Sequence, residues 1–139
     1  MTTLDWNEIT VGHELPSHEC GPISRWVLAM FAGGSGDHMP VHIDIDAARK
    51  FGMKDVFAHG MLSMAYLAQL LLKFTKQENI RKYAVRFTSI TPVNARVSCS
   101  GKVLEKFEAE GERRIRVAIQ TKIDDGTVTL EGEAVIAVP

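Results

Sequence analysis

The hydrophobic positions change their spacing about halfway along the chain. In the first half they recur at helical spacing, and from Lys82 onward they follow the pattern of extended strands. The sequence therefore predicts helices first and an antiparallel sheet after them, which is an α+β architecture.

Three helices are expected in the first half, after a short strand and loop over residues 9–20. Ser24 is a suitable N-cap for the first helix, and the run Gly33-Gly34-Ser35-Gly36 ends it. A second, short helix over residues 44–51 is acidic at its start and basic near its end. The third stretch, residues 60–74, is apolar on nearly every face, which predicts a buried helix at the centre of the domain.

The second half is rich in Val, Ile, Thr and Phe and contains two clear turn signals. These are Glu110-Gly111-Glu112 and Asp124-Asp125-Gly126. Polar and apolar residues alternate over residues 114–120, as in a sheet with one face on water and one on a helix. The expected strands are residues 82–90, 95–108, 113–123 and 127–138.

Composition narrows the class of protein. The chain has 139 residues, of which 45% are apolar and 24% charged, and these values suit one globular domain over residues 1–139. Sixteen basic residues stand against seventeen acidic ones, for a formal charge of -1. Because neither sign dominates, no nucleic-acid partner and no membrane partner is expected.

The chain also carries no targeting signal that we recognise. Its start lacks the basic and apolar regions of a signal peptide, and the apolar stretch over residues 61–72 is too short to span a bilayer. We therefore expect a cytoplasmic protein. Cys20 and Cys99 are far apart and lack CxxC spacing, so buried or idle thiols are expected rather than a zinc site or a redox pair.

The residues with the clearest chemical potential lie between the first and third expected helices. Asp37 and His42 can exchange protons with a substrate, and Pro40 between them disfavours regular helix, so the chain must turn there. Further on, His59-Gly60 precedes the apolar helix, whose first N–H groups can hold a developing negative charge on a carbonyl oxygen.

Two segments together resemble the MaoC-like dehydratase and (R)-specific enoyl-CoA hydratase family. They are Phe31-Ala32-Gly33-Gly34-Ser35-Gly36-Asp37-His38-Met39-Pro40-Val41-His42-Ile43-Asp44 and Phe57-Ala58-His59-Gly60-Met61-Leu62. The likeness is strong over residues 24–74 and looser from Arg86-Phe87 to Pro92-Val93 and over the closing strands. It implies a single MaoC-like hot-dog domain over residues 1–139, with a long central helix wrapped by a curled antiparallel sheet.

The resemblance also implies a reaction. The expected enzyme is a hydro-lyase that reversibly hydrates trans-2-enoyl thioesters of CoA or acyl carrier protein to (R)-3-hydroxyacyl thioesters, in fatty acid or related acyl metabolism. No cofactor is expected. The family's catalytic pair maps onto Asp37 and His42, and its carbonyl-holding backbone amide maps onto Gly60. His42 is then the base toward water and Asp37 the proton donor to the α-carbon.

Three further residues are expected to bind substrate. Met39 stands where many members of the family carry Asn, so it adds bulk and offers no donor. His59 either lines the acyl pocket or makes a structural hydrogen bond at the helix start. Ser63 is a substitute for a hydroxyl residue that some relatives place in the central helix, where this chain has Ala68.

The sequence leaves several alternatives open. Asp37 alone could be a turn residue and His42 a structural histidine. His38, His42 and Asp44 look superficially like metal ligands, but Pro40 breaks their helical spacing, and no metal site is expected. A hot-dog thioesterase and a non-catalytic acyl-thioester-binding subunit of a heteromeric dehydratase are the alternative functions.

A homodimer is expected from the resemblance and from the unpaired edges of a small sheet. In that arrangement the CoA arm would run along the subunit boundary. Its phosphates would meet one of four basic residues, which are Arg81, Lys82, Arg86 and Arg96.

Overall fold

The computed structural model describes residues 4–138, and over this part of the chain the predicted order of helices and strands is confirmed. One strand and three helices precede four long strands, and two short 3-10 turns join them. The elements are β1 (Glu14–Cys20), α1 (Arg25–Ser35), η1 (Pro40–His42), α2 (Ile45–Lys50), α3 (Gly60–Leu72), η2 (Gln77–Asn79), β2 (Ile80–Phe87), β3 (Val97–Ala109), β4 (Glu112–Ile123) and β5 (Val128–Ala137).

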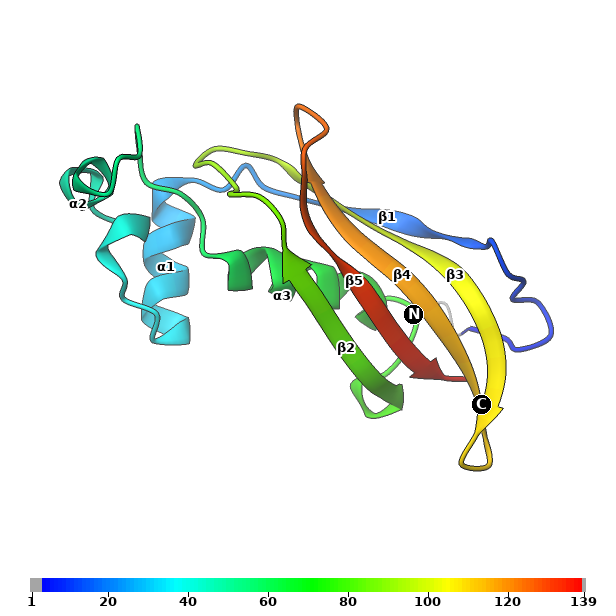
Figure 1. Cartoon of the computed structure of the whole chain (residues 1–139). Coiled ribbons are helices and arrows are strands. Elements are labelled where there is room, and N and C mark those ends of the chain that lie inside the picture. Colours follow the sequence, from blue (N-terminus) through cyan, green and yellow to red (C-terminus); the bar gives the residue numbers. More distant parts are fainter. Residues whose placement is uncertain (1–3, 139) are drawn as a thin grey trace.

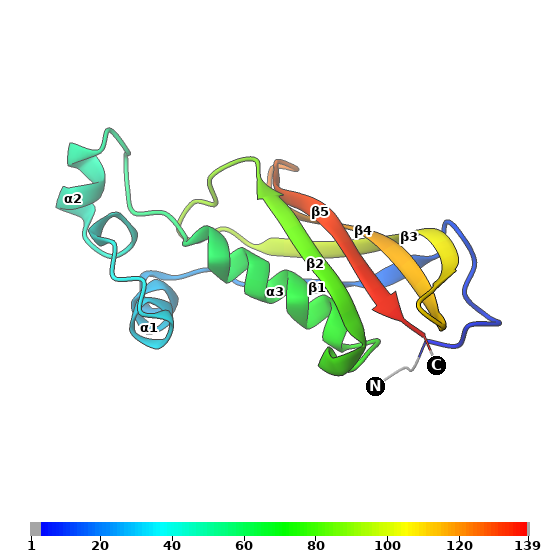
Figure 2. The ribbon, with the colours of Figure 1, turned by 60° about the horizontal axis from the view of Figure 1, so that its bottom comes forward.

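The five strands form one antiparallel sheet that curls around α3. Their order is β1-β3-β4-β5-β2, so β1 and β2 are the two edges. Figures 1 and 2 show the sheet crossing diagonally over α3. Leu67, Leu70 and Leu71 of the helix are fully buried, as are Ile115 and Val117 of β4. These side chains belong to one core between the helix and the sheet.

The expectation that α3 is buried on every side is only partly right. Leu62, Leu67 and Leu70 are buried, but Met61 is 53% exposed and Leu72 is 38% exposed, and Ala65 is exposed between them. The sheet covers one face of the helix and leaves this stripe open among the described residues. No helix within residues 4–138 has the length and hydropathy needed to cross a bilayer.

The first two helices form an arm that lies beyond the N-terminal end of α3 (Figure 1). Ser24 caps α1 by accepting a hydrogen bond from the Val27 N–H at 3.3 Å, and Asp44 caps α2 in the same way. The first helix continues through two of its glycines and ends at Gly36, which has a φ of 77°. Arg25 anchors the arm through a bidentate ion pair with Asp55, with N–O distances of 2.9 and 2.6 Å.

The two cysteines, distant in sequence, lie on neighbouring strands. Cys20 of β1 pairs with Val97 of β3, and Cys99 lies two residues further along β3. Both are free thiols. Burial raises the pKa of Cys20, and it raises the pKa of Cys99 to about 12, so both thiols stay protonated and weakly nucleophilic at neutral pH.

Candidate active site

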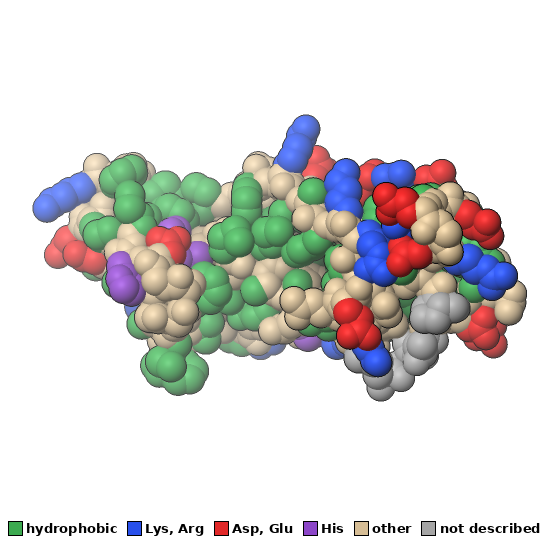
Figure 3. All heavy atoms as spheres, turned by 90° about the horizontal axis from the view of Figure 1, so that it is seen from below, with side chains coloured by type: hydrophobic (Ala, Val, Ile, Leu, Met, Phe, Trp, Pro, Cys, Tyr) green, Lys and Arg blue, Asp and Glu red, His purple; other side chains and the backbone are tan. Residues whose placement is uncertain are grey.

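Asp37, His42 and His59 come together at the N-terminal end of α3. Asp37 follows α1, His42 ends the 3-10 turn η1, and His59 is the N-cap of α3. One polar atom of each lies within 4.8 Å of the others. On the face seen in Figure 3, histidines lie among hydrophobic side chains at the helical end, whereas charged side chains gather at the opposite end.

His42 is held in one tautomer by the backbone of Phe57. Its Nδ1 lies 2.8 Å from the Phe57 carbonyl oxygen. Because a carbonyl can only accept, Nδ1–H is the donor, and in the neutral ring Nε2 carries the lone pair. The Phe57 ring meets the imidazole edge to face at 4.9 Å. His42 therefore presents an oriented base.

Asp37 forms a turn and still keeps one carboxylate oxygen free. Its Oδ1 accepts a hydrogen bond from the Met39 N–H at 3.3 Å, and its own N–H donates to the Ser35 hydroxyl at 3.2 Å. Within residues 4–138, Oδ2 has no hydrogen-bond or ion-pair partner. The side chain is exposed. The turn role considered from the sequence thus leaves one oxygen available for chemistry.

The acid and the base are close without touching. No hydrogen bond or ion pair joins Asp37 to His42 in the described part of the chain, yet their nearest polar atoms lie within 4.8 Å. A gap of this size admits one water molecule bonded to both groups.

His59 contacts both members of this pair. Its Nε2 lies 3.1 Å from the backbone oxygen of Asp37, and its ring stacks on His42 with centroids 4.0 Å apart. The side chain is only 1% exposed. Burial lowers the pKa of His59, against the opposing effect of the hydrogen bond to the Asp37 carbonyl, so the ring is neutral at neutral pH.

Gly60 begins α3 directly after His59, and its side-chain position is filled by another residue. A Cβ there would lie 2.7 Å from two ring carbons of Phe87 at the end of β2. Since a helical Cβ points toward the helix N-terminus, the Phe87 ring lies beside the leading amides. Among residues 4–138, the N–H groups of Gly60 and Met61 have no acceptor.

The other two predicted substrate-binding residues lie in different environments. Met39 is 48% exposed, next to Asp37, whereas Ser63 is fully buried one turn into α3. Within the described residues the Ser63 hydroxyl has no hydrogen-bond partner, and neither has Nδ1 of His59.

The geometry suits proton transfer better than metal binding. His42 and His59 each use one ring nitrogen to donate to a backbone carbonyl. Their rings are stacked at an interplanar angle of 28°, and because a ring-nitrogen lone pair lies in the plane of its ring, two such planes do not direct their lone pairs at one nearby point. A metal ion needs lone pairs that converge at about 2.0–2.1 Å. The structure also groups Asp37 and His59 with His42, and not the His38 and Asp44 that the sequence suggested.

The sequence did not identify three of the contacts that build this site. They are the Phe57 carbonyl, the Phe31 ring, which meets His59 at 4.9 Å, and the Phe87 ring. A backbone acceptor leaves no mark in a sequence, because every residue has a carbonyl. The looser likeness at Arg86-Phe87 was the one signal for Phe87.

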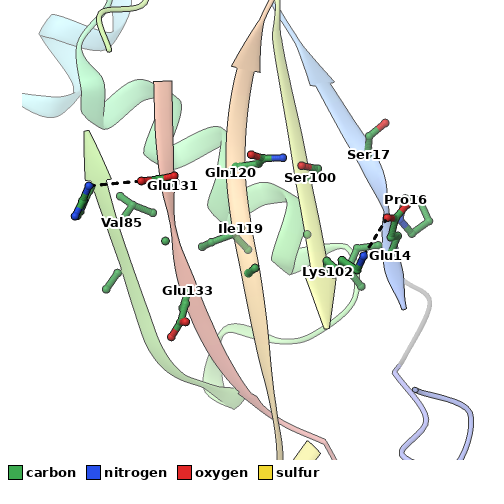
Figure 4. A pocket seen from close by; sticks show the side chains of 16 residues that line it. Glu14, Pro16, Ser17, Val85, Ser100, Lys102, Ile119, Gln120, Glu131 and Glu133 are labelled. Carbon is green, nitrogen blue, oxygen red and sulfur yellow. Dashed lines mark ion pairs between the residues drawn. The ribbon is translucent and has the colours of Figure 1, made fainter. Parts of the chain in front are cut away.

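A hollow lies apart from these residues, on the face of the sheet turned away from α3 (Figure 4). Its volume is about 1070 Å³, and its lining includes the ion pairs Arg86–Glu131 at 3.6 Å and Lys102–Glu14 at 3.9 Å. None of the predicted catalytic and substrate-binding residues lines it, but Arg86, one of the four basic residues expected near CoA phosphates, does. It is a saddle of the twisted sheet, and Asp37, His42 and His59 lie apart from it.

A curled antiparallel sheet around one long helix defines the hot-dog class of fold, and solved structures share it. An R-hydratase from Pseudomonas aeruginosa in the unliganded form superposes with a TM-score of 0.83 at 30% identity, covering 96% of this chain and 84% of that one. An (R)-hydratase from A. caviae gives a TM-score of 0.82 at 21% identity, covering 95% and 98%.

Sequence relatives narrow the class further. The sequence model of the protein family described as MaoC-like domain matches residues 8–127. An (R)-specific enoyl-CoA hydratase from Rhodospirillum rubrum is 32% identical over 125 residues, which cover 84% of this chain and 81% of that protein. The 3-hydroxyacyl-thioester dehydratase Z of Mycobacterium tuberculosis is 25% identical over 88% of this chain and 82% of its own length. This chain belongs to the MaoC-like domain family.

Proposed function

We propose that this protein is a hydro-lyase that reversibly adds water to trans-2-enoyl thioesters and forms (R)-3-hydroxyacyl thioesters. Its relatives, an (R)-specific enoyl-CoA hydratase and R-hydratases, support this reaction. The structural observation that carries the proposal is the hydrogen bond from His42 Nδ1–H to the Phe57 carbonyl. It leaves Nε2 as a base beside the Asp37 carboxyl group.

The two groups pass one proton around a cycle. His42 Nε2 takes a proton from water as the oxygen bonds to C3 of the enoyl group, and the C2–C3 π electrons move into an enolate. Protonated Asp37 then delivers its proton to C2. The proton on His42 returns to Asp37, so the net result is the addition of one water. Dehydration runs the same steps in reverse, and any apparent pKa belongs to the pair.

The start of α3 holds the negative charge that develops on the thioester oxygen. The unpaired N–H of Gly60 is the proposed donor, and the helix dipole favours an anion at this end. Removal of such a contact typically raises the barrier by about 3 kcal/mol. The Phe87 ring beside Gly60 excludes water from one side and so strengthens this hydrogen bond.

We propose that the acyl group is carried as a thioester of CoA or of acyl carrier protein. Among the four basic residues expected near CoA phosphates, Arg81 already forms a bidentate pair with Glu112, which leaves Lys82, Arg86 and Arg96 as better candidates. Substrate contacts of Met39, His59 and Ser63 remain predictions, as does a cytoplasmic location.

Hydration of crotonyl-CoA tests the function. We expect the enoyl absorbance to fall without release of free thiol, and the product to be the (R)-3-hydroxy thioester. A chain-length series of enoyl thioesters, on CoA and on acyl carrier protein, then identifies the preferred substrate.

Two results would contradict the proposed reaction type, and a third would contradict its stereochemistry. Release of free thiol would indicate a thioesterase, and binding of enoyl thioesters without turnover would indicate a non-catalytic subunit. The S enantiomer as product would overturn the stereochemistry while leaving the reaction type in place.

We also propose a homodimer formed along the β2 edge. The Tyr83 hydroxyl donates to the Met64 carbonyl at 2.5 Å, so β2 lies beside α3. The free strand edge therefore adjoins the exposed stripe of α3, with Phe87 54% exposed at the end of the strand. Pairing two copies here would satisfy the edge amides and cover the apolar stripe.

Leu72→Glu is expected to weaken this dimer, because the variant places a charge in the apolar stripe at the end remote from the active site. Light scattering after gel filtration should give twice the 15.4 kDa chain mass for the wild type and a lower mass for the variant. Leu104→Glu, at an exposed position of β3, is the matched control. A monomeric wild type, or a fully dimeric Leu72→Glu, would contradict the proposed interface.

A further inference from the structure

Asp37 is tied to the rest of the protein by one side chain. Its hydrogen bonds to Ser35 and Met39 are local, because both partners lie two residues away. Its bond to Nε2 of His59 spans 22 positions. Among the described residues, this is the hydrogen bond that links the Asp37 loop to α3. Without it, Asp37 would keep only its local hydrogen bonds to Ser35 and Met39.

The same imidazole ring also holds His42. The two rings stack with a centroid distance of 4.0 Å, and the Phe31 ring packs edge-on against His59 at 4.9 Å. His42 itself is fixed in the ring plane by the Phe57 carbonyl. His59 supplies a contact of a different kind, on the face of the ring.

Burial prevents His59 from acting as an acid or base toward solvent. The side chain is 1% exposed, and burial lowers its pKa. The Asp37 carbonyl requires a donor, so the neutral ring carries its proton on Nε2 and leaves Nδ1 unprotonated. Ser63, whose buried hydroxyl also has no partner among residues 4–138, lies one helical turn later.

We propose that His59 is a positioning residue for hydration, which fixes Asp37 through its backbone and His42 through ring stacking. The acid and the base are thereby held on the same side of the substrate. This inference rests on the proposed function. His59 acts through these two residues and does not touch the reacting atoms. A misplacement of about 1 Å in such a pair can cost about 100-fold in rate.

Two substitutions separate this role from a general structural one. The amide nitrogen of Gln reaches roughly the place of Nε2, so His59→Gln keeps the bond to the Asp37 carbonyl and loses the stacking. The shorter His59→Asn loses both. We expect His59→Asn to lower kcat about 100-fold and His59→Gln to recover about tenfold of that loss. KM for crotonyl-CoA should be little changed in both, and exposed His13→Gln is the control.

The wild-type protein gives an independent measurement. In ¹⁵N NMR of the imidazoles at neutral pH, His59 should show a protonated Nε2 and an unprotonated Nδ1, as the hydrogen bond to the Asp37 carbonyl and the lowered pKa of the buried ring require. A protonated Nδ1 would overturn the proposal. So would wild-type kcat in His59→Asn, equal loss in the Gln and Asn variants, or a loss explained by the unfolded fraction. If the wild type hydrates no enoyl thioester, the proposed function fails, but the NMR measurement still tests the bond to Asp37.

Discussion

Asp37→Asn is expected to lose most hydratase activity, roughly 100- to 10,000-fold in kcat for crotonyl-CoA, while the protein stays folded. Asn keeps the side-chain oxygen that accepts from the Met39 N–H, so the turn should survive. The amide cannot deliver a proton to C2. Loss of enoyl absorbance measures the rate, and a thermal melt measures the fold.

This substitution separates the two roles of Asp37 that the sequence left open. A residue that only forms a turn can be replaced by Asn at little cost, because Asn forms the same turn. Asp46→Asn, in the first turn of α2, is the control with an exposed carboxylate that has no proposed role. Hydration at the wild-type rate by Asp37→Asn would sink the proposed mechanism.

His42→Asn is expected to produce a loss of similar size, about 100- to 10,000-fold in kcat. The Asn amide nitrogen lies near the position of Nδ1 and can still donate to the Phe57 carbonyl, which His42 reaches at 2.8 Å. What disappears is Nε2, the proposed base. The same absorbance assay measures the loss, and gel filtration checks that the oligomer persists.

Exposed His38→Asn serves as the control for a nearby imidazole. A purely structural His42 would be replaced well by Asn, because the hydrogen bond that defines the structural role is kept. Near-wild-type turnover in His42→Asn would therefore assign the base to another group.

The active site also explains why Gly60 is glycine in a way that the sequence alone did not. Close approach of the acyl group is one reason. The structure adds that a Cβ would collide with Phe87 at 2.7 Å. Phe87 is 54% exposed in the single chain, so it also lies where the proposed partner subunit would pack. In the proposed reaction and the proposed dimer, Phe87 is therefore next to both the oxyanion donor and the partner subunit.

The sequence by itself determined the features that depend on local physics. The helix cap at Ser24 and the turns at the glycine signals act over a few residues, and the structure confirms them. The change of hydrophobic period predicted the order of helices and strands for the same reason. Asp37, Pro40 and His42 also lie close enough along the chain for their common turn to be predicted.

Only the tertiary structure decided the features that depend on partners distant in sequence. The first residue of β2 is Ile80, two positions before the predicted start, because it pairs with Ile136 of β5. The apolar pattern of α3 could not reveal its exposed stripe, since exposure depends on where the sheet ends.

The chemical features of the site also fall into those that the sequence predicts and those that only tertiary contacts decide. The sequence supplied an acid, an imidazole and a helix start, but not the tautomer of His42, the stacking of His59 or the ring over Gly60. Those depend on contacts of His42 with Phe57, of His59 with His42 and of Gly60 with Phe87, which the fold brings close. Hydrophobic period and capping are properties of short segments, whereas hydrogen bonds and ring contacts between distant segments exist only once the core has packed.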